Sequence, residues 1–395
     1  MNDGINIFVS ESNDPSPPPH IKVIGLGSAG ISAVNRMIDA GLEGMDFVVI
    51  DTDSKALEHS RATNSIYIKS LDRPSENSLE GFGDPVLIGI ENIMPHLKEA
   101  EMVILVAGLG GETATILARF ILQFADTLNF FSVAIVSTPF HFEGRPRMQR
   151  ATQSLRILSP IVDNLLIVPD ERMFTGEVSS LADAFKVADD VLRQAVQAIC
   201  DLATVPGLVN LDFADVKAVL TGGAGFIGAG RATDANREVD ATMQALTSPL
   251  LEENYIREAT GVLINITGGP DLTLSEVNTA AELIRAACND DANIIFGAVI
   301  DENLTNEIRV TLVFTGLTLS SNADSFDDRF FEKTDRSSTY APDIFIAWDP
   351  EIVSTEDYAR LVQSLGDLVR IEGGVGVARI RHLGINVLVR EGMLV

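Results

Sequence analysis

One segment near the N-terminus constrains the fold more than any other, because an apolar strand, a glycine-rich turn, a helix and a second strand follow one another. The strand and turn read IKVIGLGSAG (21–30), the helix ISAVNRMIDAGL (31–42) and the second strand MDFVVIDTD (45–53). This order is typical of a βαβ unit with parallel strands. Further strands at 102–106 and 131–136, then at 164–168, continue the alternation. We therefore expect an α/β fold with a doubly wound, mainly parallel sheet, in which ligands bind at the carboxyl ends of the strands.

The remainder of the chain divides by composition and periodicity. A long amphipathic helix ends at a Val-Pro-Gly sequence, and shorter strands and helices follow it. A Ser/Asp-rich stretch without a sustained period then predicts a linker. The predicted parts are a disordered N-terminal tail (1–20), a main α/β domain (21–183), a central helix (184–206), a smaller α+β domain (207–317), a linker (318–342) and an appended small α/β module (343–395).

The composition excludes several functional classes. The chain has 29 Lys+Arg against 56 Asp+Glu, and a net charge of −27 repels nucleic acid and anionic lipid. No apolar run approaches the roughly twenty residues of a membrane span. The N-terminus lacks the basic and apolar regions of a signal peptide. Cys200 and Cys288 have neither metal spacing nor a disulfide framework. We expect a cytoplasmic protein with no transmembrane segment, no nucleic-acid partner and no protein metal site.

Two glycine-rich turns carry the strongest chemical signal. The first, at 25–30, reads G-x-G-x-x-G, and Asp51 or Asp53 lies about twenty residues further on, as in dinucleotide-binding folds. Glycines placed for packing alone are the plainer interpretation. The second turn, AGLGGETAT (107–115), also joins a strand to a helix, where free backbone N–H groups face anions. Two such loops on neighbouring strands suit a polyphosphate better than a dinucleotide.

Six segments, in this order, resemble the FtsZ/tubulin family: IKVIGLGSAG, AGLGGETAT, PFHFEGRPR, PGLVNLDFADVK, NITGG and DANIIFGAVIDE. The likeness runs from about residue 21 to residue 317. It implies a Rossmann-like GTP-binding domain at 21–183, an activation and C-terminal domain at 207–317, and GTP or GDP as the ligand. It also implies a longitudinal homopolymer that hydrolyses GTP between stacked subunits, with a role in cell division or a related cytoskeletal process at the division site.

The resemblance implies roles for individual residues. Asp212 and Asp215, with Asn210, enter the neighbouring subunit's nucleotide site in the family, where the acids polarise a water toward the γ-phosphate. Phe185 corresponds to the aromatic that stacks on the base. Asp189 corresponds to the acceptor for guanine N1 and N2, and it excludes adenine because adenine N1 is itself an acceptor.

Other nucleotide contacts are implied by position on the loops. The two phosphate loops supply Gly27, Ser28, Ala29, Gly30, Ile31, Ser32, Gly108, Leu109, Gly110, Gly111, Glu112, Thr113 and Ala114. The sugar side is formed by Thr138, Pro139, Glu143, Arg147 and Asp170. Plainer interpretations stay open, since the N-x-D-x-x-D acids can cap a helix, a helix aromatic is often a core residue and a Glu/Arg pair four apart is often an ordinary ion pair.

The sequence departs from the family pattern around the phosphates. Ser28 and Ala29 place Cβ atoms where the family has glycines. Glu112 puts a carboxylate into a loop that holds negative oxygens, which is costly unless a metal or a proton intervenes. Replacing Glu112 by Gly is therefore expected to raise nucleotide affinity or turnover. The loop GFGDP (81–85) is about three residues shorter than usual, and Asp170 stands where the family has Asn.

Two alternatives and one cofactor question stay open at this point. A divergent paralogue with weak or no GTPase activity would bind nucleotide and modulate or scaffold filaments, with its C-terminal module engaging another FtsZ-like protein or an unknown partner. An NAD-dependent oxidoreductase is favoured only by the first glycine turn and Asp51 or Asp53. Whether Mg²⁺ accompanies the nucleotide in the usual way is left open.

Overall fold

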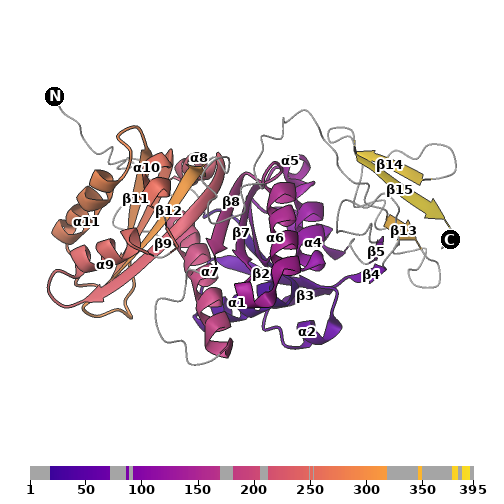
Figure 1. The fold of residues 1–395 in the computed structure, drawn as a ribbon, viewed down its shortest axis with the longest axis horizontal. Helices are drawn as coiled ribbons and strands as arrows, with labels where there is room; N and C mark the ends of the chain where they lie inside the picture. The colour runs from indigo at the N-terminus through magenta and orange to yellow at the C-terminus, as the bar shows by residue number, and fades with distance from the viewer. Residues whose placement is uncertain are drawn as a thin grey trace.

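The structure is a computed structural model of the 395-residue chain. It describes residues 18–71, 86–88, 92–169, 181–204, 212–248, 250–251, 253–317, 346–348, 376–380 and 385–391. These residues build a 10-stranded sheet in the order β11-β10-β12-β9-β8-β7-β6-β1-β2-β3, with helices on both faces (Figure 1). The predicted α/β class with a mainly parallel sheet is confirmed.

The N-terminal half is the doubly wound part, and its strands are parallel to one another. Its main strands are β1 (Ile21–Leu26), β2 (Met45–Asp51), β3 (Asn64–Tyr67), β6 (Met102–Gly108), β7 (Phe131–Thr138) and β8 (Asn164–Pro169). Its helices are α1 (Gly27–Asp39), α2 (Ser54–Glu58), α3 (Met94–Leu97), α4 (Glu112–Leu122), α5 (Ala125–Leu128), the 3₁₀ helix η2 (His141–Glu143) and α6 (Arg145–Leu158). Strands such as β6 read as continuous apolar runs because both of their faces are buried.

The C-terminal half follows a long helix and mixes strand directions. β9 pairs antiparallel with β12 and β12 with β10, whereas β10 and β11 are parallel. The helices are α7 (Leu181–Thr204), α8 (Phe213–Leu220), α9 (Arg237–Leu246), α10 (Glu253–Glu258) and α11 (Leu274–Ala287). The strands are β9 (Gly223–Thr233), β10 (Gly261–Gly268), β11 (Asn293–Ile300) and β12 (Glu307–Leu317). The predicted central helix is therefore present, beginning and ending slightly earlier than expected.

The sheet continues across the predicted boundary between the two domains. Asn164 to Leu166 of β8 pair in parallel with Gly223 to Gly225 of β9. One face of the sheet packs against α1, α7 and α8, and the opposite face packs against α4, α6, α9 and α11. Because α7 contacts strands of both halves, it holds them to a common apolar layer. The proposed domain limits stay a prediction.

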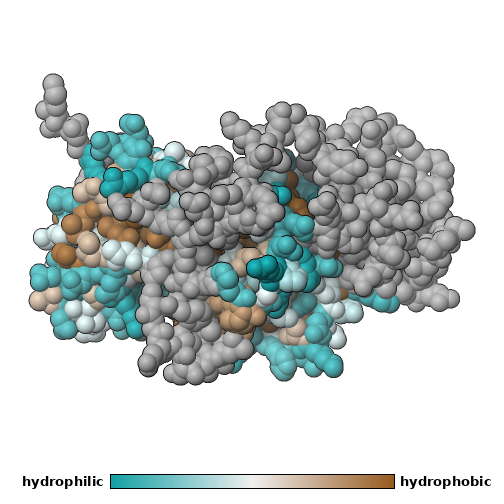
Figure 2. All heavy atoms as spheres, viewed as in Figure 1, coloured by the Kyte–Doolittle hydropathy of each residue, from teal (hydrophilic) through white to brown (hydrophobic). Residues whose placement is uncertain are grey.

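Two small sheets complete the described structure. β4 (Lys69–Leu71) pairs with β5 (Val86–Ile88), and β15 (Ile385–Glu391) lies between β13 (Ile346–Trp348) and β14 (Gly376–Ile380). The strands predicted in the appended module are thus present, while its predicted helix lies outside the described residues. The described face in Figure 2 is largely hydrophilic, with an apolar area over the C-terminal half near α10 and α11. No helix in the described ranges has both the length and the apolarity to span a bilayer.

Candidate functional site

The first glycine turn places the start of α1 at the carboxyl end of β1. Gly27 has φ +70°, a conformation that L side chains rarely adopt, and it begins the helix. A Cβ on Gly30 would lie 2.5 Å from the Val106 carbonyl oxygen, so this glycine lets α1 pack closely on β6. Ser28 and Ala29 are exposed, whereas the Ile31 side chain is buried in the core. Ile31 was predicted to contact the nucleotide, but its side chain is buried in the core and cannot touch a ligand.

The second glycine turn begins α4 beside the first. Gly110 has φ +96°, and a Cβ there would lie 2.8 Å from Pro139 Cγ. A Cβ on Gly111 would meet nothing within 4 Å. The Leu109 and Ala114 side chains are buried, so Leu109 and Ala114 shape the loop from within.

The two turns meet at the carboxyl ends of the paired strands β1 and β6, where the strand order reverses and doubly wound folds have a ligand crevice. A Cβ on Gly108 would lie 2.7 Å from Ala29 Cβ, and one on Gly27 would lie 4.0 Å from Ala114 Cβ. The first turns of α1 and α4 consequently converge with free backbone N–H groups and the positive ends of their dipoles. This geometry favours an anion with several negative oxygens.

The end of β2 closes the crevice through residues that were not predicted as phosphate contacts. The Asp51 carboxylate accepts hydrogen bonds from the backbone N–H groups of Thr52 (2.7 Å) and Asp53 (3.2 Å) and from Ser28 Oγ (3.4 Å). Burial raises the pKa of Asp51 despite these donors. The Thr52 and Thr113 hydroxyl oxygens lie 3.0 Å apart and link β2 to α4. In the sequence, this link between β2 and α4 was indicated by Asp51 and Thr52, two polar residues at the end of an apolar strand.

A buried carboxylate, Asp189, lies in the N-terminal half of α7. Asp189 Oδ2 accepts from Ser32 Oγ at 2.6 Å and from Arg36 Nε at 3.3 Å. Burial raises the pKa of Asp189, against the opposing effects of Ser32 and Arg36. Both of these hydrogen bonds go to Oδ2, and no hydrogen bond joins Oδ1 to the described residues. Arg36 was missed at the sequence level, although it lies one helical turn after Ser32 on the same face of α1.

Phe185 lies one helical turn before Asp189 and forms an aromatic cluster with Phe140 and Phe142, which lie at η2. Phe185 is 42% exposed, and its ring packs edge-on against Phe140, with ring centroids 5.5 Å apart. Phe142 is stacked on Phe140 at 5.0 Å and is 60% exposed. Phe185 is therefore not a core residue, and its exposed ring offers a surface for a planar group. The sequence prediction did not include Phe140 and Phe142, although their F-x-F pattern was visible.

The loop after β7 supplies a charged pair on the same side of the sheet. Glu143 Oε1 accepts from the Phe140 N–H at 3.0 Å, and Glu143 Oε2 accepts from Arg147 Nη1 at 2.6 Å. Thr138 and Pro139 are buried beneath this loop. In this structure the two charged residues satisfy each other, as the ion-pair interpretation expected, and half of the Arg147 side chain remains exposed. Asp170 lies outside the described residues.

The predicted water-activating acids lie elsewhere. Asp212 is the N-cap of α8, accepts from the Ala214 N–H at 3.0 Å and is exposed, and Asp215 follows in the first turn. The helix-cap interpretation is thus correct for Asp212. From Asp189 to Thr204, α7 rises by about 22 Å, so α8 begins at the far end of the sheet from the crevice (Figure 1). Asn210 lies outside the described residues.

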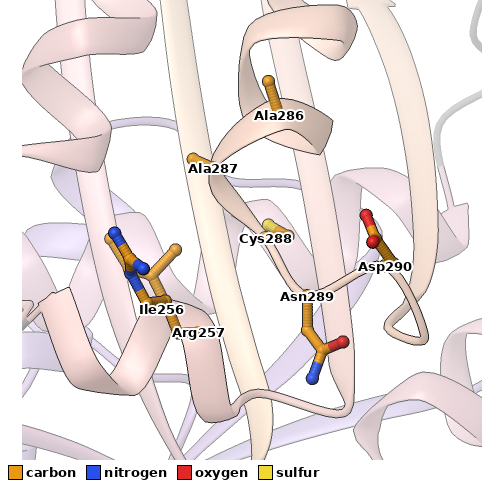
Figure 3. A pocket seen from close by; sticks show the side chains of 7 residues that line it. All are labelled: Ile256, Arg257, Ala286, Ala287, Cys288, Asn289 and Asp290. Atoms are coloured by element: carbon orange, nitrogen blue, oxygen red, sulfur yellow. The ribbon is translucent and has the colours of Figure 1, made fainter.

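A separate pocket of about 490 Å³ opens between α10 and the end of α11 (Figure 3). It is lined by Ile256, Arg257, Ala286, Ala287, Cys288, Asn289 and Asp290. Burial raises the pKa of the Cys288 thiol to about 11, so the thiol is protonated and weakly nucleophilic at neutral pH. This pocket lies near the amino-terminal ends of β10 and β11 and takes no part in the crevice. In the described ranges no group of three or more His, Cys, Asp or Glu is arranged to hold a metal.

Two convergent helix N-termini, a carboxylate and an exposed aromatic ring define a nucleotide-binding protein of the doubly wound α/β class. The family model "Tubulin/FtsZ family, GTPase domain" matches residues 20–176, and "FtsZ family, C-terminal domain" matches residues 223–318. The chain belongs to the FtsZ family. This assignment leaves the oxidoreductase alternative without support.

Individual relatives agree with the family match. The chain is 43% identical to the cell division protein FtsZ of Rickettsia bellii over 306 residues, 76% of this chain and 67% of that protein. It resembles the solved structure "FtsZ dimer, empty" from M. jannaschii with a TM-score of 0.67 and 36% identity, over 75% of this chain and 88% of that chain. CetZ2 from Haloferax volcanii, at 18% identity and a TM-score of 0.61 over 78% of this chain and 96% of that chain, shares the fold.

Proposed function

We propose that this protein binds GTP in the crevice between β1 and β6 and hydrolyses it between subunits stacked head to tail. The base would lie on Phe185 with its N1 and N2 donors on Asp189, and the phosphates would face the first turns of α1 and α4. Asp212 and Asp215 of the next subunit, with Asn210, would orient the attacking water. The resulting filament would act in cell division, in the cytoplasm at the division site.

The main support for this proposal is the separation along α7 of two half-sites. One half-site is the crevice, and the other is the pair of acids Asp212 and Asp215 on α8. A continuous helix cannot fold back, so the acids of one chain stay at the end of the sheet opposite to that chain's crevice. Asp212 is exposed there, and neither acid is buried at a contact within the chain. Stacking two copies in the same orientation brings one chain's acids to the other chain's crevice, and repetition of this heterologous contact gives a filament. A solved relative is described as an "FtsZ dimer", which supports the proposal that this chain associates with copies of itself.

Mg²⁺ belongs to the same proposal as the cation that accompanies the phosphates. The crevice offers the oxygen donors that Mg²⁺ prefers, namely the Glu112 carboxylate and the Thr52 and Thr113 hydroxyls. When bound, the cation would neutralise charge on the phosphate oxygens. The protein residues hold the nucleotide, keep Glu112 beside it and receive the acids of the neighbouring chain.

Mixing two inactive variants tests the shared site directly. Asp189→Asn should lose guanine binding, because an amide cannot accept from both base donors. The double variant Asp212→Asn with Asp215→Asn should bind GTP but not hydrolyse it. An equal mixture should recover up to about a quarter of wild-type GTPase activity, because a random stack pairs an intact crevice with intact acids at one contact in four.

The control for this mixture is Asp240→Asn, which neutralises an exposed acid in the first turn of α9 and should remain fully active alone. A mixture of the two inactive variants that stays inactive, while the double variant still binds GTP, would contradict hydrolysis in trans. That outcome would favour the nucleotide-binding paralogue without catalysis.

A further inference from the structure

Glu112 lies in the proposed phosphate site without a partner among the described residues. It is the first residue of α4, follows the N-cap Gly111 and is exposed. Its carboxylate makes no hydrogen bond or ion pair with the described residues. Because the free N–H groups of α4 point outward from this same turn, an anion bound to them lies within about one helical turn of the carboxylate.

The charges around the crevice do not neutralise Glu112. Asp51 and Asp53 add further carboxylates at the end of β2. Both arginines described at the site are paired with other acids, Arg36 with Asp189 and Arg147 with Glu143. A free nucleotide would therefore bring several more negative charges close to Glu112, Asp51 and Asp53, whose carboxylates these arginines do not neutralise.

A divalent cation would relieve this repulsion by binding the Glu112 carboxylate and the phosphate oxygens at the same time. Mg²⁺ commonly binds one or two carboxylates together with substrate phosphates. The described residues offer no group of three or more His, Cys, Asp or Glu that could hold a metal, so Glu112 needs further ligands to bind a cation. The Glu112 carboxylate and the phosphates would together supply the oxygen ligands that neither provides alone.

We propose that Glu112 makes the divalent cation obligatory for nucleotide binding, so that the site accepts the metal–nucleotide complex and rejects the free nucleotide. This inference rests on the proposed function, because it assumes phosphates at the start of α4. It assigns Glu112 a role in ligand specificity. The wild-type residue would thereby couple occupancy of the crevice to the concentration of free Mg²⁺.

Calorimetric titration with GDP, which is not turned over, tests the inference. Each protein is titrated in MgCl₂ and in EDTA, and the ratio of the two affinities is compared. The ratio should be about tenfold larger for the wild type than for Glu112→Gln, mainly because the variant binds GDP more tightly in EDTA. Glu112→Asp keeps the charge and should retain most of the wild-type ratio.

Asp126→Asn is the matched control, since Asp126 is also an exposed acid in the first turn of a helix, in α5. It should behave as the wild type. Equal ratios for the wild type and Glu112→Gln, or equal loss of affinity in both buffers, would overturn the inference. If the wild type bound no GDP in either buffer, the proposed function itself would fail, so the two failures are distinguishable. Thermal melts verify that each variant is folded.

Discussion

At the residue scale, two adjacent glycines of the second turn have different structural roles. Gly110 combines φ +96° with a Cβ direction blocked by Pro139 and by the Arg147 carbonyl oxygen. Gly111 has φ −96° and faces open space. The sequence pattern GG does not distinguish them, because their difference depends on the loop after β7, which packs against only one of them.

Alanine substitutions should separate the two glycines. Gly110→Ala should lower the free energy of unfolding by about 1–3 kcal/mol, because it adds backbone strain and a steric overlap. Gly111→Ala should change it by less than about 0.5 kcal/mol. Urea unfolding without nucleotide measures both values. Equal destabilisation by the two substitutions would contradict the observed loop conformation.

At the element scale, α7 carries a titratable group at its contact with the C-terminal half. The Asp201 carboxylate accepts hydrogen bonds from Asn265 of β10 and from Gln197. Burial raises its pKa from 3.8 to about 6, with a further increase from Asp301 and an opposing effect from Arg193. A carboxyl whose pKa is raised by folding destabilises the fold once it ionises, so its cost grows as the pH rises from about 4 to above 6.

Asp201→Asn should therefore stabilise the protein at pH 7.5, by about 1–2 kcal/mol after allowance for solvent screening, and have little effect near pH 4. Unfolding by urea at a series of pH values measures the difference. Asp190→Asn on the same helix is the control with the opposite sign. Asp190 accepts from Arg193 and Gln194, and its pKa is lowered, so its substitution should destabilise near pH 7. A pH-independent effect of Asp201→Asn would show that the group does not titrate in this range.

At the scale of the whole molecule, the continuous sheet and the length of α7 fix the separation between the crevice and the acids. The crevice and the acids are held on the same layer of helices, since α1, α7 and α8 pack against one apolar face of the sheet. Under the proposed mechanism, GTP hydrolysis requires two associated chains, whereas nucleotide binding to one crevice does not.

GTP turnover per subunit should consequently rise with protein concentration and then level off as stacking saturates. The affinity for GDP should stay constant over the same range, which provides an internal control. Phosphate release measured across a dilution series, beside GDP titrations, gives both quantities. A turnover number independent of concentration would place the complete site within one chain.

The sequence by itself determined the α/β class, the two glycine turns and the family, because these depend on local periodicity, turn chemistry and contiguous motifs. It also marked Phe185 and Asp189, which lie one turn apart on α7. The tertiary structure alone decided that Ser32 and Arg36 hold Asp189, that Ile31 faces the core and that the sheet runs through both halves. Those features depend on how segments distant in the chain pack together, and packing over such distances leaves no periodic signal in either segment.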